Sequence, residues 1–139
     1  MIVLDTNVIS ELMKAEPETK VITWADRQDP QALVTTAITA AELYAGFEQM
    51  PGGKNSDKLE RTLNIMLEQR FRGRILPFDE SCAPVFAKIL ARRRAMGRRI
   101  EEPDAMIAAI CSNHHFKIAT RDTGGFSHCG IEVINPWTD

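Results

Sequence analysis

The chain has 139 residues, of which 44% are hydrophobic and 26% charged, and its formal net charge is −2. These values are typical of one globular domain that buries its own core, so we expect residues 1–139 to form a single domain. No apolar run approaches the roughly 20 residues of a membrane-spanning helix, and the first five residues lack a signal-peptide pattern, so we expect a cytoplasmic protein without membrane contact.

The hydrophobic pattern alternates between short apolar runs and longer stretches with helical spacing. In chain order, the short runs predict strands at 2–4, 33–35, 75–78, 117–120 and 131–134. The longer stretches predict helices at 8–13, 17–24, 39–47, 57–71, 79–96 and 103–111. Short apolar strands separated by helices indicate an α/β fold, here a three-layer sandwich with a central, mainly parallel sheet.

Acidic residues fall at the ends of these expected elements. In open parallel sheets, sites form outside the carboxyl ends of the strands, so these side chains are candidates for one common site. They are Asp5 directly after the first strand, Glu42 in the helix after the second, Asp104 in the first turn of the helix at Pro103, and Asp122 just after the strand 117–120.

Each of these acidic residues also has a purely structural explanation. Asp5 could cap the following helix, and Glu42 could complete a capping box with Thr39. Asp104 is favoured at a helix N-terminus by the helix dipole, and Asp122 could be a turn residue. The sequence leaves these alternatives open for each residue taken singly.

A common site for all four carboxylates would require a cation. Two unit charges about 4 Å apart repel by about 4 kcal/mol at an effective dielectric constant of about 20, so a bound cation or proton uptake must offset the charge. Oxygen ligands suit Mg²⁺ or Mn²⁺, and such ions assist phosphodiester hydrolysis. The neutral polar side chains of Thr6, Asn7 and Thr120 lie next to the acidic set in the sequence and are candidates for holding a carboxylate or a metal-bound water in place.

Arginines cluster on and just after the helix expected at 79–96. Arg92, Arg93 and Arg99 are candidates for contact with RNA phosphates, although a run of charges is also typical of a solvated helix face. Few aromatic residues are present, at 6%, so we expect any RNA recognition to rest on backbone and shape.

Four sequence motifs resemble those of PIN-domain nucleases. They are Leu4-Asp5-Thr6-Asn7, the Thr39–Glu42 element, Pro103-Asp104-Ala105-Met106-Ile107-Ala108 and Ala119-Thr120-Arg121-Asp122. Their order, the chain length and the ending Asn135-Pro136-Trp137 resemble VapC-type toxins of type II toxin–antitoxin systems, especially the FitB-like branch.

This resemblance implies a parallel-sheet PIN fold and an endoribonuclease. It places Asp5, Glu42, Asp104 and Asp122 at the family's acidic positions, where they would bind one or two Mg²⁺ or Mn²⁺ ions and cleave RNA with metal-activated water. It also implies a homodimer held inactive by a small antitoxin in the catalytic groove, with DNA contacted only through the antitoxin. The alternative is a non-catalytic partner in an antitoxin-containing DNA-binding repressor complex.

Overall fold

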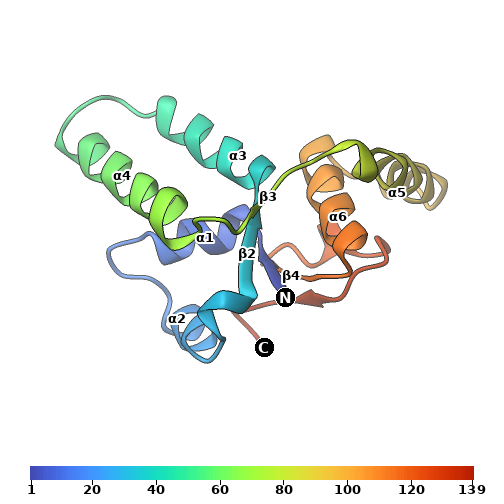
Figure 1. Ribbon diagram of the computed structural model, residues 1–139, viewed down its shortest axis with the longest axis horizontal. Coiled ribbons are helices and arrows are strands. Elements are labelled where there is room, and N and C mark those ends of the chain that lie inside the picture. Colours follow the sequence, from blue (N-terminus) through green and yellow to red (C-terminus); the bar gives the residue numbers. More distant parts are fainter.

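A five-stranded sheet forms the centre of the computed structural model, which describes residues 1–139 (Figure 1). The strands are β1 (Ile2–Leu4), β2 (Leu33–Thr36), β3 (Ile75–Leu76), β4 (Lys117–Ala119) and β5 (Val133–Ile134). Their order is β3-β2-β1-β4-β5, and every neighbouring pair is parallel. The predicted α/β fold with a central parallel sheet is confirmed.

Helices cover both faces of the sheet. They are α1 (Thr6–Leu12), α2 (Thr19–Asp26), α3 (Ala37–Glu48), α4 (Lys54–Asn64), α5 (Ala83–Ala95) and α6 (Glu102–His114). A π-helical segment, Ile65–Arg70, continues α4, and short 3₁₀ turns form at Pro30–Ala32, Glu80–Cys82 and Gly124–Phe126. None of the helices is long and apolar enough to cross a membrane.

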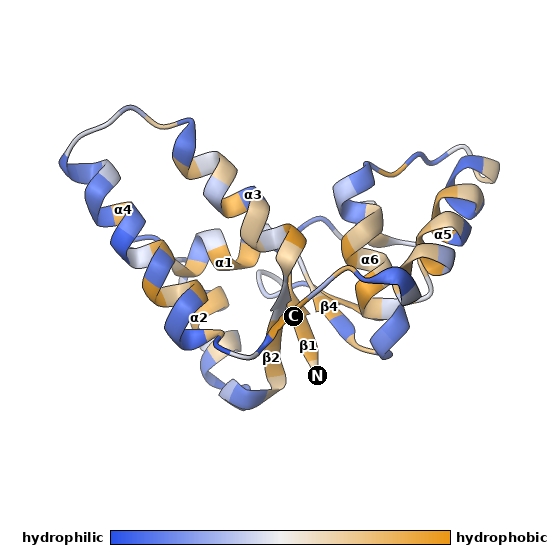
Figure 2. Ribbon diagram, turned by 45° about the horizontal axis from the view of Figure 1, so that its top comes forward, coloured by the Kyte–Doolittle hydropathy of each residue, from blue (hydrophilic) through white to orange (hydrophobic).

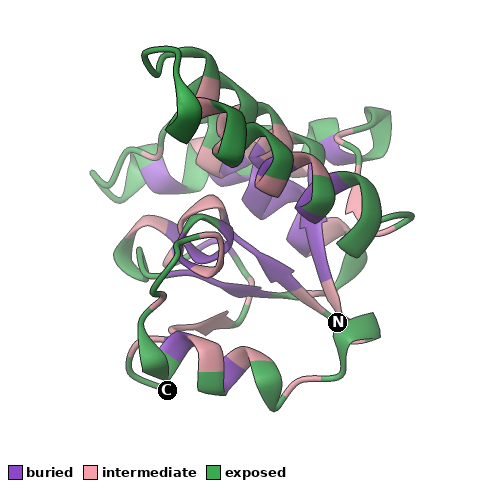
Figure 3. Ribbon diagram, turned by 90° about the vertical axis from the view of Figure 1, so that its left-hand side faces the viewer, coloured by how far each residue is buried: buried purple, intermediate pink, exposed green.

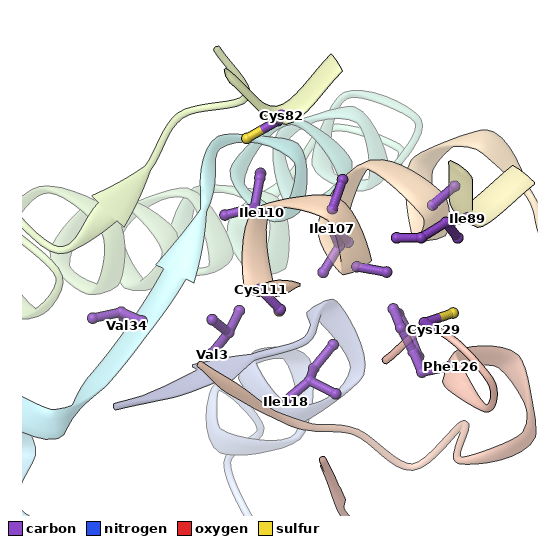
Figure 4. Packing of buried hydrophobic residues seen from close by; sticks show 13 residues of the cluster. Val3, Val34, Cys82, Ile89, Ile107, Ile110, Cys111, Ile118, Phe126 and Cys129 are labelled. Carbon is purple, nitrogen blue, oxygen red and sulfur yellow. The ribbon is translucent and has the colours of Figure 1, made fainter. Parts of the chain in front are cut away.

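Side chains on successive strand residues point to opposite faces, which produces two hydrophobic clusters. Val3, Val34 and Ile118 pack against Ile107 and Ile110 of α6 on one face of the sheet (Figure 4). Leu4 and Ala119 face the other way, into a cluster with residues of α1, α2 and the π-helical segment. The buried strands therefore lie between two helical layers (Figure 3), as the predicted three-layer sandwich requires.

Hydrophobic residues gather at the sheet and on the helix faces that touch it, while α4 is largely polar (Figure 2). Leu63 is the buried residue of α4. This helix packs against α3 away from the sheet (Figure 1), so most of its surface contacts solvent.

The strand order brings the candidate residues to one edge of the sheet. The chain moves from β1 outward through β2 to β3, and then returns to the opposite side of β1 to form β4 and β5. The order of the strands thus reverses between β1 and β4, and ligands of open α/β sheets bind at such a reversal, outside the carboxyl ends of the strands. Asp5 follows β1, and Thr120 and Asp122 follow β4, so they flank this position.

The start of α3 differs from the prediction. Thr36, at the end of β2, caps the helix: its hydroxyl oxygen accepts a hydrogen bond from the Thr39 backbone N–H at 3.0 Å. The expected capping box of Thr39 with Glu42 is wrong, because the chain bends into the helix three residues earlier. Glu42 consequently lies in the second turn, and its carboxylate is not used as a cap.

The cap at Thr36 predicts a measurable loss of stability. Replacing Thr36 by Val keeps the volume but removes the hydroxyl, and we expect unfolding free energy to fall by about 1 kcal/mol or more in urea denaturation. Thr36→Ser retains the hydroxyl and should lose less. No loss in Thr36→Val, together with a clear loss in Thr36→Ser, would show that the methyl group, and not the cap, matters here.

Candidate active site

Asp5 is the most buried of the four candidate carboxylates, with 5% of its surface exposed. Its backbone N–H donates to the carbonyl of Ala119 at 3.0 Å, which extends the β1–β4 pairing to the edge of the sheet. Its Oδ1 accepts from the backbone N–H of Thr6 at 2.8 Å and so caps α1. Its Oδ2 accepts from the Thr120 hydroxyl at 2.7 Å. Asp5 therefore caps α1 and also belongs to the candidate site.

Asn7 and Thr120 join the two segments that follow β1 and β4. The side-chain amide of Asn7 lies 3.3 Å from Asp5 Oδ2 and 3.2 Å from the Thr120 hydroxyl oxygen, and its Oδ1 accepts from the backbone N–H of Arg121 at 3.1 Å. The Thr120 oxygen accepts from the backbone N–H of Asp122 at 3.0 Å. These contacts hold the chain around Asp122 against Asp5.

Glu42 reaches the same region from α3. Its carboxylate is half-buried, and Oε1 accepts a hydrogen bond from the Thr6 hydroxyl at 2.7 Å. Thr6 thus binds Asp5 through its backbone and Glu42 through its side chain. The structure brings Thr6, Asn7 and Thr120 into direct contact with the candidate carboxylates.

Asp104 completes the set from the first turn of α6. Burial, together with the negative charges of Asp5, Glu42 and Asp122, raises the pKa of Asp104 to about 6. Asp122 is exposed, and its Oδ1 accepts from the Gly125 backbone N–H at 3.0 Å. Asp122 is therefore a turn residue, as one of the two explanations predicted, and its charge also acts on Asp104.

The negative charge of this cluster has no cationic partner within the chain. The ion pairs of the structure are Lys14–Glu11 and Lys117–Glu132, and neither includes a residue of the cluster. Burial also raises the pKa of Asp5, against the opposing hydrogen bond from Thr120. In this structure no three His, Cys, Asp or Glu side chains are arranged so that they could hold a metal ion. The oxygen-only donors and their unbalanced charge nevertheless suit a hard divalent cation.

The predicted RNA contacts divide between the surface and the interior. Arg92 and Arg99 are exposed and remain candidates. Arg93 is 4% exposed, and its guanidinium donates to backbone carbonyls, among them those of Ser127 at 2.7 Å and Arg98 at 2.6 Å. The prediction that Arg93 contacts RNA is therefore wrong, because its donors are taken up inside the protein.

Gly125 has a role at the site that the sequence reasoning missed. A Cβ atom at this position would lie 2.2 Å from Asp122 Oδ2, whereas one at Gly124 would meet nothing within 4 Å. Gly125 therefore allows the Asp122 carboxylate to fold back onto the turn. The signal in the sequence was the Gly-Gly pair directly after Asp122-Thr123, which indicates only a turn.

A groove adjoins the cluster on the side of α3. It has a volume of about 270 Å³ and begins at Thr6 and Glu42. Its apolar walls come from the residue that follows α1 and from α3 and α4, namely Met13, Leu43, Phe47, Leu59 and Leu63.

A parallel sheet of this order with acidic residues at the carboxyl edge is the architecture of a PIN domain. The family model described as "PIN domain" matches residues 2–131, and the chain belongs to the PIN-domain family.

Full-length relatives define its place within the family. The chain is 47% identical to plasmid stability protein StbB of Pseudomonas syringae pv. tomato, with 99% of each chain covered. It is 44% identical to VapC ribonuclease Y4jK of Sinorhizobium fredii, over 99% of this chain and 98% of the relative. Toxin FitB of Neisseria gonorrhoeae is 40% identical over the whole of both chains.

Solved structures agree with these relatives. The crystal structure of FitAcB from Neisseria gonorrhoeae superimposes with a TM-score of 0.93 at 40% identity, covering 100% of both chains. FitAB bound to an IR36 DNA fragment gives a TM-score of 0.94 at 38% identity, covering 100% of this chain and 97% of that one. The predicted resemblance to VapC-type proteins of the FitB-like branch is confirmed.

The raised pKa of Asp104 predicts that the metal-free protein loses stability as pH rises. In the folded chain Asp104 keeps its proton up to about pH 6, whereas its ordinary pKa is 3.8. The folded state therefore binds more protons between these values, and its stability falls as pH increases through that window. We expect Asp104→Asn to be more stable than the wild type near neutral pH, with a weaker dependence on acid pH, in thermal unfolding with EDTA.

Glu102→Gln is the matched control, because Glu102 is exposed and shares the first turn of α6. It removes one charge at the same helix terminus, where an acidic residue is favourable, so we expect no gain in stability. A loss of stability in Asp104→Asn equal to that in Glu102→Gln would contradict the charge-repulsion explanation.

The two neighbouring glycines provide a second test. Gly125→Ala should keep the fold but turn the Asp122 carboxylate away and break its bond to the backbone N–H of residue 125, since the new methyl group occupies its position. Gly124→Ala should leave Asp122 in place. Crystal structures of both variants measure this, and an unmoved Asp122 in Gly125→Ala would contradict the steric argument.

Proposed function

We propose that this protein is a Mg²⁺- or Mn²⁺-dependent endoribonuclease and the toxin of a toxin–antitoxin pair. The observation that carries the proposal is the cluster of Asp5, Glu42, Asp104 and Asp122, which has no cationic partner and in which burial and the neighbouring negative charges together raise the pKa of Asp104 to about 6. Full-length relatives named VapC ribonuclease and Toxin FitB supply the reaction class and the biological role.

The four carboxylates are the residues that would hold the metal. Their oxygens match the ligand preference of Mg²⁺ and Mn²⁺, and one or two dications would balance their charge. When bound, such an ion lowers the pKa of a coordinated water and stabilises negative charge on the phosphoryl group under attack. Because no three of these carboxylates are arranged to hold one ion in this structure, their side chains would have to move closer together on binding.

Neighbouring residues would keep these ligands in place. Thr120 and Asn7 hold Oδ2 of Asp5, and the Thr6 hydroxyl holds one oxygen of Glu42, which leaves the remaining lone pairs of each carboxylate for a cation. Fixing the ligands before binding lowers the entropic cost of assembling the site. The exposed guanidinium groups of Arg92 and Arg99 are proposed to contact RNA phosphates.

The proposed partners are an RNA substrate and a small antitoxin. The groove beside Glu42 is apolar along α3 and α4 and open at the site, so an antitoxin segment lying in it would block access to the carboxylates. The relative FitAB was solved on DNA, and we propose that this chain likewise meets DNA through its antitoxin. We further propose that the chain is cytoplasmic and that it forms a homodimer, the latter as the resemblance implies.

Cleavage of a mixed RNA panel by antitoxin-free protein tests the enzymatic proposal. We expect cutting with Mg²⁺ or Mn²⁺ and none with EDTA. Asp5→Asn and Asp104→Asn should each reduce the rate by at least about a hundredfold, or about 2.7 kcal/mol of transition-state stabilisation, since each removes ligand charge with little change of volume.

The outcomes separate the nuclease from its rival. Unchanged cleavage in both variants would contradict the metal site. A folded protein that neither binds Mn²⁺ nor cuts RNA would instead support the non-catalytic partner of an antitoxin in a DNA-binding repressor complex.

A further inference from the structure

Arg93 is a buried arginine whose guanidinium donates hydrogen bonds to several backbone carbonyl groups. It lies in the last turn of α5 and is 4% exposed. Its Nε donates to the carbonyl of Arg98 at 2.6 Å, and Nη2 lies 3.4 Å from that of Arg99. Nη1 lies within hydrogen-bond distance of three further carbonyls, those of Ser127 at 2.7 Å, Gly125 at 3.0 Å and Gly124 at 3.4 Å.

No carboxylate balances this buried charge. Neither ion pair of the structure includes Arg93. Removing a cation from water is costly unless its donors are satisfied, and here the dipoles of the carbonyl groups satisfy them. A planar guanidinium can reach several carbonyls at once in fixed directions, which an ammonium group cannot. The segments that carry these carbonyls are therefore tied to one rigid group.

Both segments lead directly to candidate metal ligands. The carbonyls of Arg98 and Arg99 lie just before α6, whose first turn carries Asp104. The carbonyls at 124–127 belong to the turn after Asp122. Gly125 connects the two interactions, because its carbonyl accepts from Arg93 while its N–H donates to Asp122 Oδ1 at 3.0 Å.

We propose that Arg93 is a positioning residue of the active site, which sets the placement of Asp122 and of the α6 terminus that carries Asp104. The proposal rests on the function proposed above, in which these two residues hold a divalent cation. Arg93 touches neither the cation nor the RNA. It acts through the backbone of two segments, namely the connection between α5 and α6 and the turn that follows β4.

The test compares Arg93→Gln and Arg93→Lys with Arg94→Gln in the metal-free full chain. Arg94 is the next residue of the same helix and is exposed, so it is the matched control. Two quantities are measured, namely the Kd for Mn²⁺ by calorimetry and the ¹⁵N backbone order parameters of residues 98–101 and 122–127. The order parameters of Ile2–Leu4, in the central strand, report whether the fold is kept.

We expect Arg93→Gln to raise the Kd for Mn²⁺ by about 10- to 100-fold, the usual effect of removing a group that orients metal ligands. Order parameters in both loops should fall from about 0.85 toward 0.6, while those of Ile2–Leu4 stay high. Arg93→Lys should show a smaller change of the same kind, because a single ammonium group can hold only some of the carbonyls. Arg94→Gln should match the wild type.

Two results would overturn the proposal. One is unchanged Mn²⁺ affinity and loop order in Arg93→Gln. The other is a uniform loss of order that includes Ile2–Leu4, which would make Arg93 a general stabilising residue. If the wild type itself does not bind Mn²⁺, the proposed function fails. Unchanged loop order in Arg93→Gln would then reject the positioning role as well, and disorder confined to the two loops would support it.

Discussion

The unbalanced negative charge at the carboxyl edge of the sheet is the constraint on which the other features of the site depend. Asp5 lies in the interior, and burial together with the negative charges of Asp5, Glu42 and Asp122 raises the pKa of Asp104. Such an arrangement costs free energy in the absence of a cation. The hydrogen bonds from Thr6 and Thr120 lower that cost for Asp5 and fix its orientation. The cluster thus lowers the stability of the metal-free fold, which is a common feature of functional sites.

The parallel topology explains why these residues meet. Consecutive parallel strands need crossover helices, so each strand end at the carboxyl edge is followed by a loop or a helix start. The reversal between β1 and β4 leaves a gap in which those loops diverge, and Asn7 bridges it through Asp5, Thr120 and the backbone of Arg121. The same polar groups therefore join the segments that follow β1 and β4 and fix the position of Asp5.

Helix geometry separates the neighbouring arginines into two roles. Successive residues of α5 point about 100° apart, so Arg93 turns inward while Arg92 and Arg94 face solvent. In the interior, the guanidinium of Arg93 binds the segments next to Asp104 and Asp122. Outside, the guanidinium groups of Arg92 and Arg94 contact solvent. An arginine run in a sequence cannot distinguish these roles, because its helical phase depends on where the helix packs.

Local pattern was sufficient to predict the strands, the six helices, the parallel sheet and the four acidic candidates, because hydrophobic spacing and the ends of elements are properties of short segments. The expected capping box at Thr39 is wrong, since Thr36 caps the helix three residues earlier. Tertiary structure alone decided the burial of Arg93, the effect of Gly125 on Asp122 and the contact of Thr6 with Glu42. These features join residues about 30 or more positions apart, or depend on the fold of a loop, and only packing brings such groups together.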